Sequence, residues 1–262
     1  MGIWHIIMIE DILKALKVAD RWMLLSWYDI KAKYRRSILG PFWLVIIYLV
    51  SSASLGILGS IMMKTDMRSI FPSLAAGLFA WNMFNAVLME SCDVFIRSTF
   101  IIQNVRVNLL EFVFRMVSRN LIVAAHTLVV LIIILLFLVG INSNIFWLIP
   151  YIALFTINAV FIGVVLGFFT TRFRDVQQLV QSVMSILFFL TPIMWKKEML
   201  ADKQFIAYLN PFANFLEILR EPLLGNVPSD FAISYCLIFT LVMFILTFFI
   251  YKKYQHRLIY WL

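Results

Sequence analysis

The sequence predicts an all-α integral membrane protein with six transmembrane helices, and three observations lead to this fold class. Of its 262 residues, 63% are hydrophobic and 14% are charged, whereas soluble domains are about 45–50% apolar and about 25% charged. Several apolar runs reach the roughly 20 residues that a helix needs to cross a bilayer. A basic cluster stands directly before the first of these runs.

Residues 10–28 are predicted to form an amphipathic helix along the membrane surface. Apolar residues such as Ile12 and Leu16 recur at three- and four-residue steps, and basic residues such as Lys14 and Arg21 fall on the opposite face. No uncharged run here is long enough to span a bilayer. Two interpretations stay open, a plain surface anchor and a gate helix that contacts a partner.

The segment DIKAKYRRSILGPF (Asp29–Phe42) joins this helix to the first apolar run. It places four positive charges within six residues, and no charged residue follows from Ser37 to Met63. A basic cluster against a long apolar run is typical of a membrane helix anchored on its cytoplasmic side.

The apolar runs place the six spans. Asn120–Thr171 contains no Asp, Glu, Lys or Arg over 52 residues, and as one helix it would be about 78 Å long. Gly140–Asn144 is therefore expected to break it into two helices. The predicted spans are residues 38–63, 69–89, 120–140, 145–171, 176–195 and 231–251.

The distribution of charge predicts the orientation. Six spans put both termini on one side, and sixteen of the 22 Lys and Arg residues lie on that side. The positive-inside rule makes it cytoplasmic. The net charge of +8 is concentrated there, so anionic membrane lipid is a sufficient partner for it and no nucleic acid is needed.

Two loops have unusual composition. Residues 97–119 mix arginines with apolar residues, which predicts either a short cytoplasmic surface helix or an extension of the neighbouring spans. Residues 196–230 form an apolar outer loop divided at Asn210-Pro211 and at Pro222. Its pieces, 199–209 and 212–221, are too short to cross, so they are predicted to be re-entrant half-helices packed against protein.

The chain carries few residues suited to catalysis or metal binding. It has no GxxxxGK[ST], HExxH or GxSxG motif, and its three histidines are scattered. Cys92 and Cys236 are expected near opposite membrane faces, without a disulfide. Among Asp, Glu, Lys, Arg and His, only His126 lies inside a predicted span, and we expect a structural role for it. Residues 1–262 are thus expected to form one non-catalytic transmembrane domain, without cofactor or metal ligands.

Three segments resemble the permease subunits of type-two ABC exporters, most closely those that export O-antigen and related bacterial surface polysaccharides. They are DIKAKYRRSILGPFW (Asp29–Trp43), RFRDVQQLVQSVMSILFFLTPIMW (Arg172–Trp195) and LNPFANFLEILREPLLG (Leu209–Gly225). The segments occur in the family's order and spacing, and the likeness covers nearly the whole chain. Where family members often carry a proline after the coupling helix, this chain reads Val107-Asn108-Leu109, which leaves the end of that helix open.

The resemblance implies a homodimer in the bacterial inner membrane, with both termini cytoplasmic and two copies of a separate ATPase subunit that binds ATP and Mg. It implies that residues 10–28 are the gate helix and that a coupling helix contacts the ATPase through Phe100, Ile101, Ile102, Gln103, Asn104 and Arg106. A polysaccharide carried on undecaprenyl diphosphate would meet Asp29, Lys31, Lys33, Tyr34, Arg35 and Arg36. The outer re-entrant segment would be organised by Asn210, Pro211, Glu217, Arg220, Pro222 and Gly225.

A polysaccharide channel suits aromatic side chains, because their faces pack against sugar C–H groups. The candidates for lining it are Trp43, Tyr48, Trp81, Phe84, Phe188 and Trp195. Other interpretations remain: an exporter of teichoic acid, capsule or another substrate, a channel-like protein, or an integral-membrane transferase of glycan or lipid. A transferase would have to draw on the outer acids Glu198, Asp202, Glu217, Glu221 and Asp230.

Overall fold

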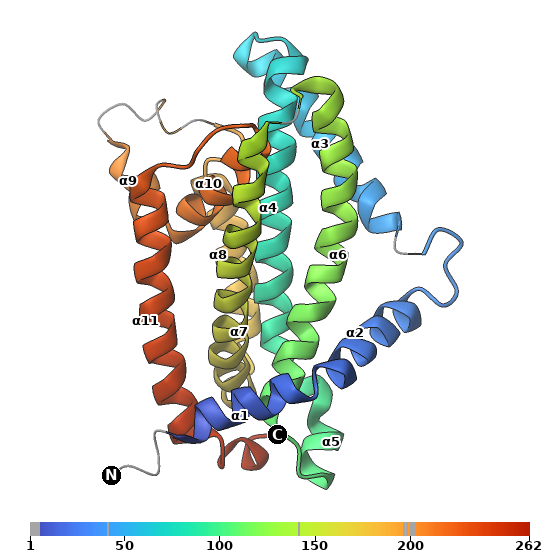
Figure 1. The fold of residues 1–262 in the computed structure, drawn as a ribbon, viewed down its shortest axis with the longest axis vertical. Coiled ribbons are helices and arrows are strands. Elements are labelled where there is room, and N and C mark those ends of the chain that lie inside the picture. Colours follow the sequence, from blue (N-terminus) through green and yellow to red (C-terminus); the bar gives the residue numbers. More distant parts are fainter. Residues whose placement is uncertain (1–5, 41, 141, 196, 198, 200–202) are drawn as a thin grey trace.

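The computed structural model describes the chain except for residues 1–5, 41, 141, 196, 198 and 200–202. The described part is a helical bundle (Figure 1). Five of its helices are long and apolar enough to cross a membrane. They are α3 (Phe42–Met63), α4 (Met67–Asp93), α6 (Leu109–Leu138), α7 (Leu148–Arg172, preceded by the 3-10 turn η2, Ser143–Trp147) and α11 (Asp230–Tyr254). The predicted class, an all-α membrane protein, is confirmed.

The fifth predicted span is shorter in the structure than the sequence suggested. Helix α8 covers Val176–Leu190, which is about 22 Å at 1.5 Å per residue, against a hydrocarbon core of about 30 Å. It ends because Thr191 precedes Pro192 and adopts an extended conformation with ψ 136°, as residues before proline prefer. Five helices are long enough to cross, and a complete crossing by the α8 segment, which would be the sixth, stays a prediction.

The third predicted span begins earlier than expected. Helix α6 starts at Leu109, not at residue 120, because the Asn108 side chain accepts a hydrogen bond from the Leu110 N–H at 3.0 Å and caps the helix. Residues 109–119 are therefore the first turns of a long helix. The short helix α5 (Thr99–Asn104) and the 3-10 turn η1 (Ile96–Ser98) precede it.

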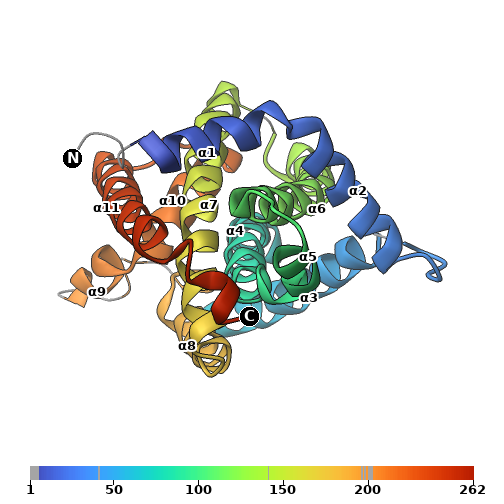
Figure 2. The same ribbon diagram turned by 90° about the horizontal axis from the view of Figure 1, so that it is seen from below.

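The predicted surface helix 10–28 is two helices, α1 (Ile6–Lys17) and α2 (Ala19–Lys33), which we call the strap. The chain bends at Val18, where the Ala15 carbonyl accepts hydrogen bonds from the Trp22 indole at 2.8 Å and from the Val18 N–H at 3.3 Å. Trp22 also stacks on Phe114 of α6, with ring centroids 5.4 Å apart. The bend lets α1 lie against α6 and α11 while α2 follows α6 around the outside of the bundle (Figure 2).

Helix α4 is the centre of the bundle and packs against α3, α6, α7, α8 and the short helix α10 (Pro211–Leu223). Figure 1 shows the strap, α5 and the C-terminal residues at one end and α9 (Phe205–Leu209) with α10 toward the other. The break predicted at Gly140–Asn144 is present, with Gly140 at φ +83°, a conformation that glycine adopts readily.

Gly167 sets the distance between α7 and the end of α4, and its substitution should destabilise the bundle. A Cβ at this position would lie 2.7 Å from both Phe95 Cε2 and Val94 Cγ1, and both neighbours are buried. We expect Gly167→Ala to lower the free energy of unfolding by about 1–3 kcal/mol, measured as loss of thermal stability in detergent. Gly77→Ala is the matched control, since its nearest neighbour would be at 3.5 Å. Equal stability of the two variants would contradict this packing argument.

Candidate functional site

The strap is fastened to the first turns of α6. The Ser26 hydroxyl, fully buried, donates to the Arg115 carbonyl oxygen at 2.8 Å. The Asn108 amide donates to the Asp11 carbonyl oxygen at 2.6 Å, and the Asp11 carboxylate accepts a hydrogen bond from the Tyr251 hydroxyl of α11 at 3.0 Å. These contacts join residues that are 89, 97 and 240 positions apart, so they fix the strap as part of the tertiary structure.

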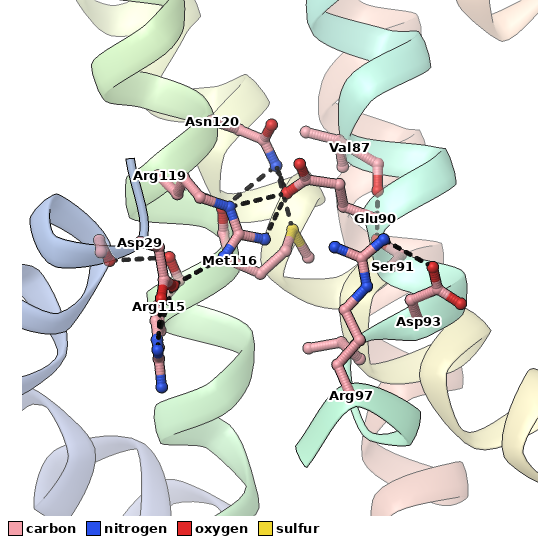
Figure 3. Close-up of polar contacts among 12 residues, drawn as sticks. Asp29, Val87, Glu90, Ser91, Asp93, Arg97, Arg115, Met116, Arg119 and Asn120 are labelled. Carbon is pink, nitrogen blue, oxygen red and sulfur yellow. Dashed lines mark hydrogen bonds and ion pairs between the residues drawn. The ribbon is translucent and has the colours of Figure 1, made fainter. Parts of the chain in front are cut away.

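An ion-pair cluster links the strap, α4 and α6 (Figure 3). Asp29 of α2 accepts hydrogen bonds from Arg115 Nε at 2.8 Å and Arg119 Nη1 at 2.9 Å. Arg119 also donates through Nη2 to Glu90 of α4 at 2.6 Å, and Asn120 donates to the same carboxylate oxygen at 3.0 Å. Arg119 thus bridges carboxylates from two different helices, with the strong geometry of charge-assisted hydrogen bonds.

The charges around Asp29 set its protonation. Burial by itself raises the pKa of this carboxyl, but hydrogen bonds and charge from Arg115 and Arg119 outweigh it, so the pKa is lower than its ordinary value. Asp29 is therefore ionised at neutral pH. The resemblance assigned Asp29 to the lipid diphosphate. In the structure its carboxylate is instead held by two arginines of α6.

A cleft of about 540 Å³ opens beside this cluster, between α2, α4, α5 and α6. It also contacts Ile101 of α5. Its charged lining residues are Asp29, Lys33, Glu90, Arg97, Arg115 and Arg119. The cleft therefore places the strap, the ion pairs and α5 around one space.

Helix α5 projects from the strap end of the bundle (Figure 1). Phe100 is 79% exposed, and Ile101, Gln103, Asn104 and Arg106 are exposed as well. Ile102 is only 4% exposed because it packs into the core, so its side chain is not on the exposed face of α5. The end of the helix, left open by the sequence, is Asn104, followed by extended backbone at Val105.

The basic residues that follow Asp29 lie at the end of α2 and in the turn after it. Lys31 Nζ lies 5.5 Å from the Trp27 ring centroid, and Lys33 Nζ lies 5.8 Å from that of Tyr34. Burial raises the pKa of Tyr34. Arg35 and Arg36 are exposed, without an ion pair in the described part of the chain.

The aromatic residues predicted to line a channel divide into two groups. Tyr48 and Phe84 are buried within this chain: the Tyr48 hydroxyl donates to the Ala75 carbonyl, and Phe84 packs edge-to-face on Phe155. Trp81 is buried as well, at the edge of a groove between α4 and α8 that the half-buried Phe188 also borders. Trp43 is exposed and Trp195 is half-buried.

Polar contacts hold α10 at the outer end. Asn210 caps this helix by accepting from the Phe212 N–H at 3.0 Å, and its amide donates to Thr191 Oγ1 at 3.1 Å. Arg220 Nη1 donates to the Pro192 carbonyl at 2.9 Å. The end of α8 is thereby tied to α10.

The remaining outer residues singled out by the sequence also serve this packing. Glu217 is buried and pairs with Lys197, Pro211 is the first residue of α10, and Pro222 lies in its last turn. Gly225, at φ +81°, offers its carbonyl to the Asn144 amide at 2.7 Å. Of the outer acids, Glu198 and Asp202 lie outside the described residues.

Sequence reasoning missed Glu90, Arg115 and Arg119, which it counted only as cytoplasmic charges, and Asn120, which it placed at the start of the third span. A local signal was available, because Glu111, Arg115 and Arg119 recur every four residues, as on one helix face. The partners Asp29 and Glu90 could not be identified from that spacing.

Comparison with known proteins gives consistent matches. A family model described as ABC-2 type transporter matches residues 20–224. Two sequences of the O-antigen export system permease protein RfbA from Klebsiella pneumoniae are 25% and 23% identical to this chain over 248 residues. Each alignment covers 91% of this chain and 93% of the relative.

Proposed function

Since the chain belongs to the ABC-2 type transporter family and resembles O-antigen export permeases over most of its length, we propose that it exports a lipid-linked polysaccharide of the O-antigen type across the bacterial inner membrane. A multi-pass membrane subunit of an ABC exporter is what the family implies. The proposal adds the substrate, the homodimer and two ATPase subunits that bind ATP and Mg.

The exposed helix α5 is the observation that carries the proposal. Its apolar residues Phe100 and Ile101 are exposed, and the helix lies at the strap end of the bundle (Figure 1). A short helix with exposed apolar residues suits a groove on a partner protein. Only four residues, 105–108, separate α5 from α6. In this mechanism, ATP binding moves α5, and α6 transmits the motion to the strap through the ion-pair cluster.

The lipid diphosphate would be met by the basic residues between α2 and α3. Arg35 and Arg36 are exposed there, and guanidinium groups bind phosphate through paired hydrogen bonds. The Arg35→Gln/Arg36→Gln double variant is expected to insert normally and to lose export, measured as surface polysaccharide against the amount of chain in the membrane. Normal surface polysaccharide in this variant would contradict diphosphate binding and would limit the role of these arginines to membrane anchoring.

The test of the function uses this chain, the ATPase subunit and the glycan genes of the same gene cluster, expressed together in a host without its own exporter. We expect co-purification with the ATPase and surface polysaccharide that depends on ATP hydrolysis. Export of teichoic acid or capsule instead would contradict the proposed substrate but would still support the assignment as an exporter. Glycan transfer by the purified chain alone, or ion conductance without ATP, would overturn the proposal.

A further inference from the structure

Helices α4 and α8 enclose a groove of about 430 Å³, here called the α4–α8 groove. Trp81 and Asn85 contribute from α4, and Gln181, Ser185 and Phe188 contribute from α8. Neither helix ends inside the groove, since α4 runs from Met67 to Asp93 and α8 from Val176 to Leu190. The groove therefore runs along the apolar part of the bundle.

Two amide side chains in the groove, Asn85 and Gln181, are unpaired with respect to the described residues. Asn85 and Gln181 are exposed, and neither side chain makes a hydrogen bond to any residue that the structure describes. An unsatisfied amide facing lipid hydrocarbon costs several kcal/mol. These amides consequently need water or a polar ligand as their neighbour, so the groove does not face lipid.

The groove contains no charged residue. The 15 residues of α8 include no Asp, Glu, Lys or Arg, and α4 has none between Ser69 and Met89. The nearest acid along α4, Glu90, is turned to Arg119 and Asn120 of α6. A polymer with a phosphate or carboxylate in every repeat would lose hydration here and gain no counter-charge, which is costly.

Aromatic rings complete a surface suited to sugars. Phe188 is half-buried and Phe189 is 73% exposed, and the buried Trp81 ring supports Phe188 edge-to-face at 5.5 Å from below. Rings of this kind pack on the C–H faces of a sugar, while amides and hydroxyls donate to and accept from its hydroxyl groups. Together with the missing charge, these groups match an uncharged, hydroxyl-rich chain.

We propose that the α4–α8 groove binds the glycan during export and that it selects an uncharged polysaccharide over polymers with a charge in each repeat. This inference rests on the proposed function, and it narrows the substrate class within it. A second copy of the chain packed into the groove is the competing occupant, which the experiments below separate.

The first experiment determines the composition of the polymer that this chain exports with the ATPase and glycan genes of its own cluster. The expected polymer has neutral repeats. Phosphate or uronic acid in every repeat would overturn the inference, although ATP-dependent export would still support the proposed function. Absence of any export would overturn the proposed function, and the inference with it.

The second experiment tests the groove itself. Gln181→Leu and Asn85→Leu are each expected to reduce surface polymer about tenfold, as for one lost hydrogen bond to the chain, at equal amounts of membrane protein and ATPase. Ser182→Leu is the matched control, because Ser182 is exposed on α8 outside the groove. Wild-type export by both groove variants would overturn the inference alone.

The third experiment separates glycan from a second copy. Gln181→Cys, in a background with Cys92→Ser and Cys236→Ser, is expected to react with a membrane-impermeant maleimide in permeabilised cells and to react more slowly during export. Leu179→Cys, on the opposite face of α8, is the control and is expected to stay unreacted. An unreactive Gln181→Cys would mean that a second copy or lipid covers the groove, which would overturn the inference.

Discussion

Phe100→Asp is expected to abolish export while leaving the bundle folded. Phe100 is 79% exposed on α5, so its replacement removes no contact inside the chain. If α5 docks on the ATPase, an acid in place of this ring loses an aromatic anchor, which at interfaces is worth about 2–4 kcal/mol. The measurement is co-purification with the ATPase subunit, together with export-coupled ATP hydrolysis.

The same substitution elsewhere at this end of the bundle controls for added negative charge. Ile259→Asp suits this purpose, since Ile259 is also an exposed apolar residue and lies in the C-terminal turn η4 (Leu258–Tyr260). It is expected to keep both association and export. Phe100→Asp that binds the ATPase as tightly as wild type would place the contact outside α5.

Asp29→Ala is expected to release the strap from α6 and to cut export strongly. Arg115 and Arg119 would lose a shared carboxylate and keep their charges at sites where the side chains are 25% and 19% exposed. Breaking a fully buried pair costs about 3–5 kcal/mol, and partial exposure brings our expectation nearer to about 2 kcal/mol. Release should appear as faster proteolysis within residues 18–36.

Asp20→Ala is the matched control for Asp29→Ala. Asp20 lies on the same helix, is exposed, and makes no ion pair with the described residues. Its substitution should leave proteolysis and export unchanged. Resistance of Asp29→Ala to proteolysis equal to that of Asp20→Ala would show that the ion pairs do not hold the strap.

The lowered pKa of Asp29 also sets the pH range of strap docking. Because the folded-state pKa lies below the ordinary value of 3.8, the stabilisation is present above that value and is lost as the pH falls through the folded pKa. Proteolysis of the strap should therefore stay constant from about pH 8 to about pH 5. Asp29→Asn should show the released state across this whole range.

The sequence by itself determined the features that depend on local chemistry. Apolar runs predicted the long helices, Gly140–Asn144 predicted the break between α6 and α7, and Asn210-Pro211 predicted the start of α10, because hydropathy and turn residues act over a few neighbours. The signal for the end of α8 was also local. Pro192 marked it, and the prediction extended to residue 195 because apolar residues continue beyond the proline.

Tertiary structure alone decided which distant residues meet and which face of each helix is covered. Asp29 meets Arg115 across 86 positions, Ile102 turns inward while Phe100 turns outward, and Phe84 is buried while Phe189 is exposed at a groove. A hydrophobic run indicates that a helix is shielded from water, but lipid, the protein core and a partner protein can each provide that shielding. Only the packing of all the helices together selects among the three.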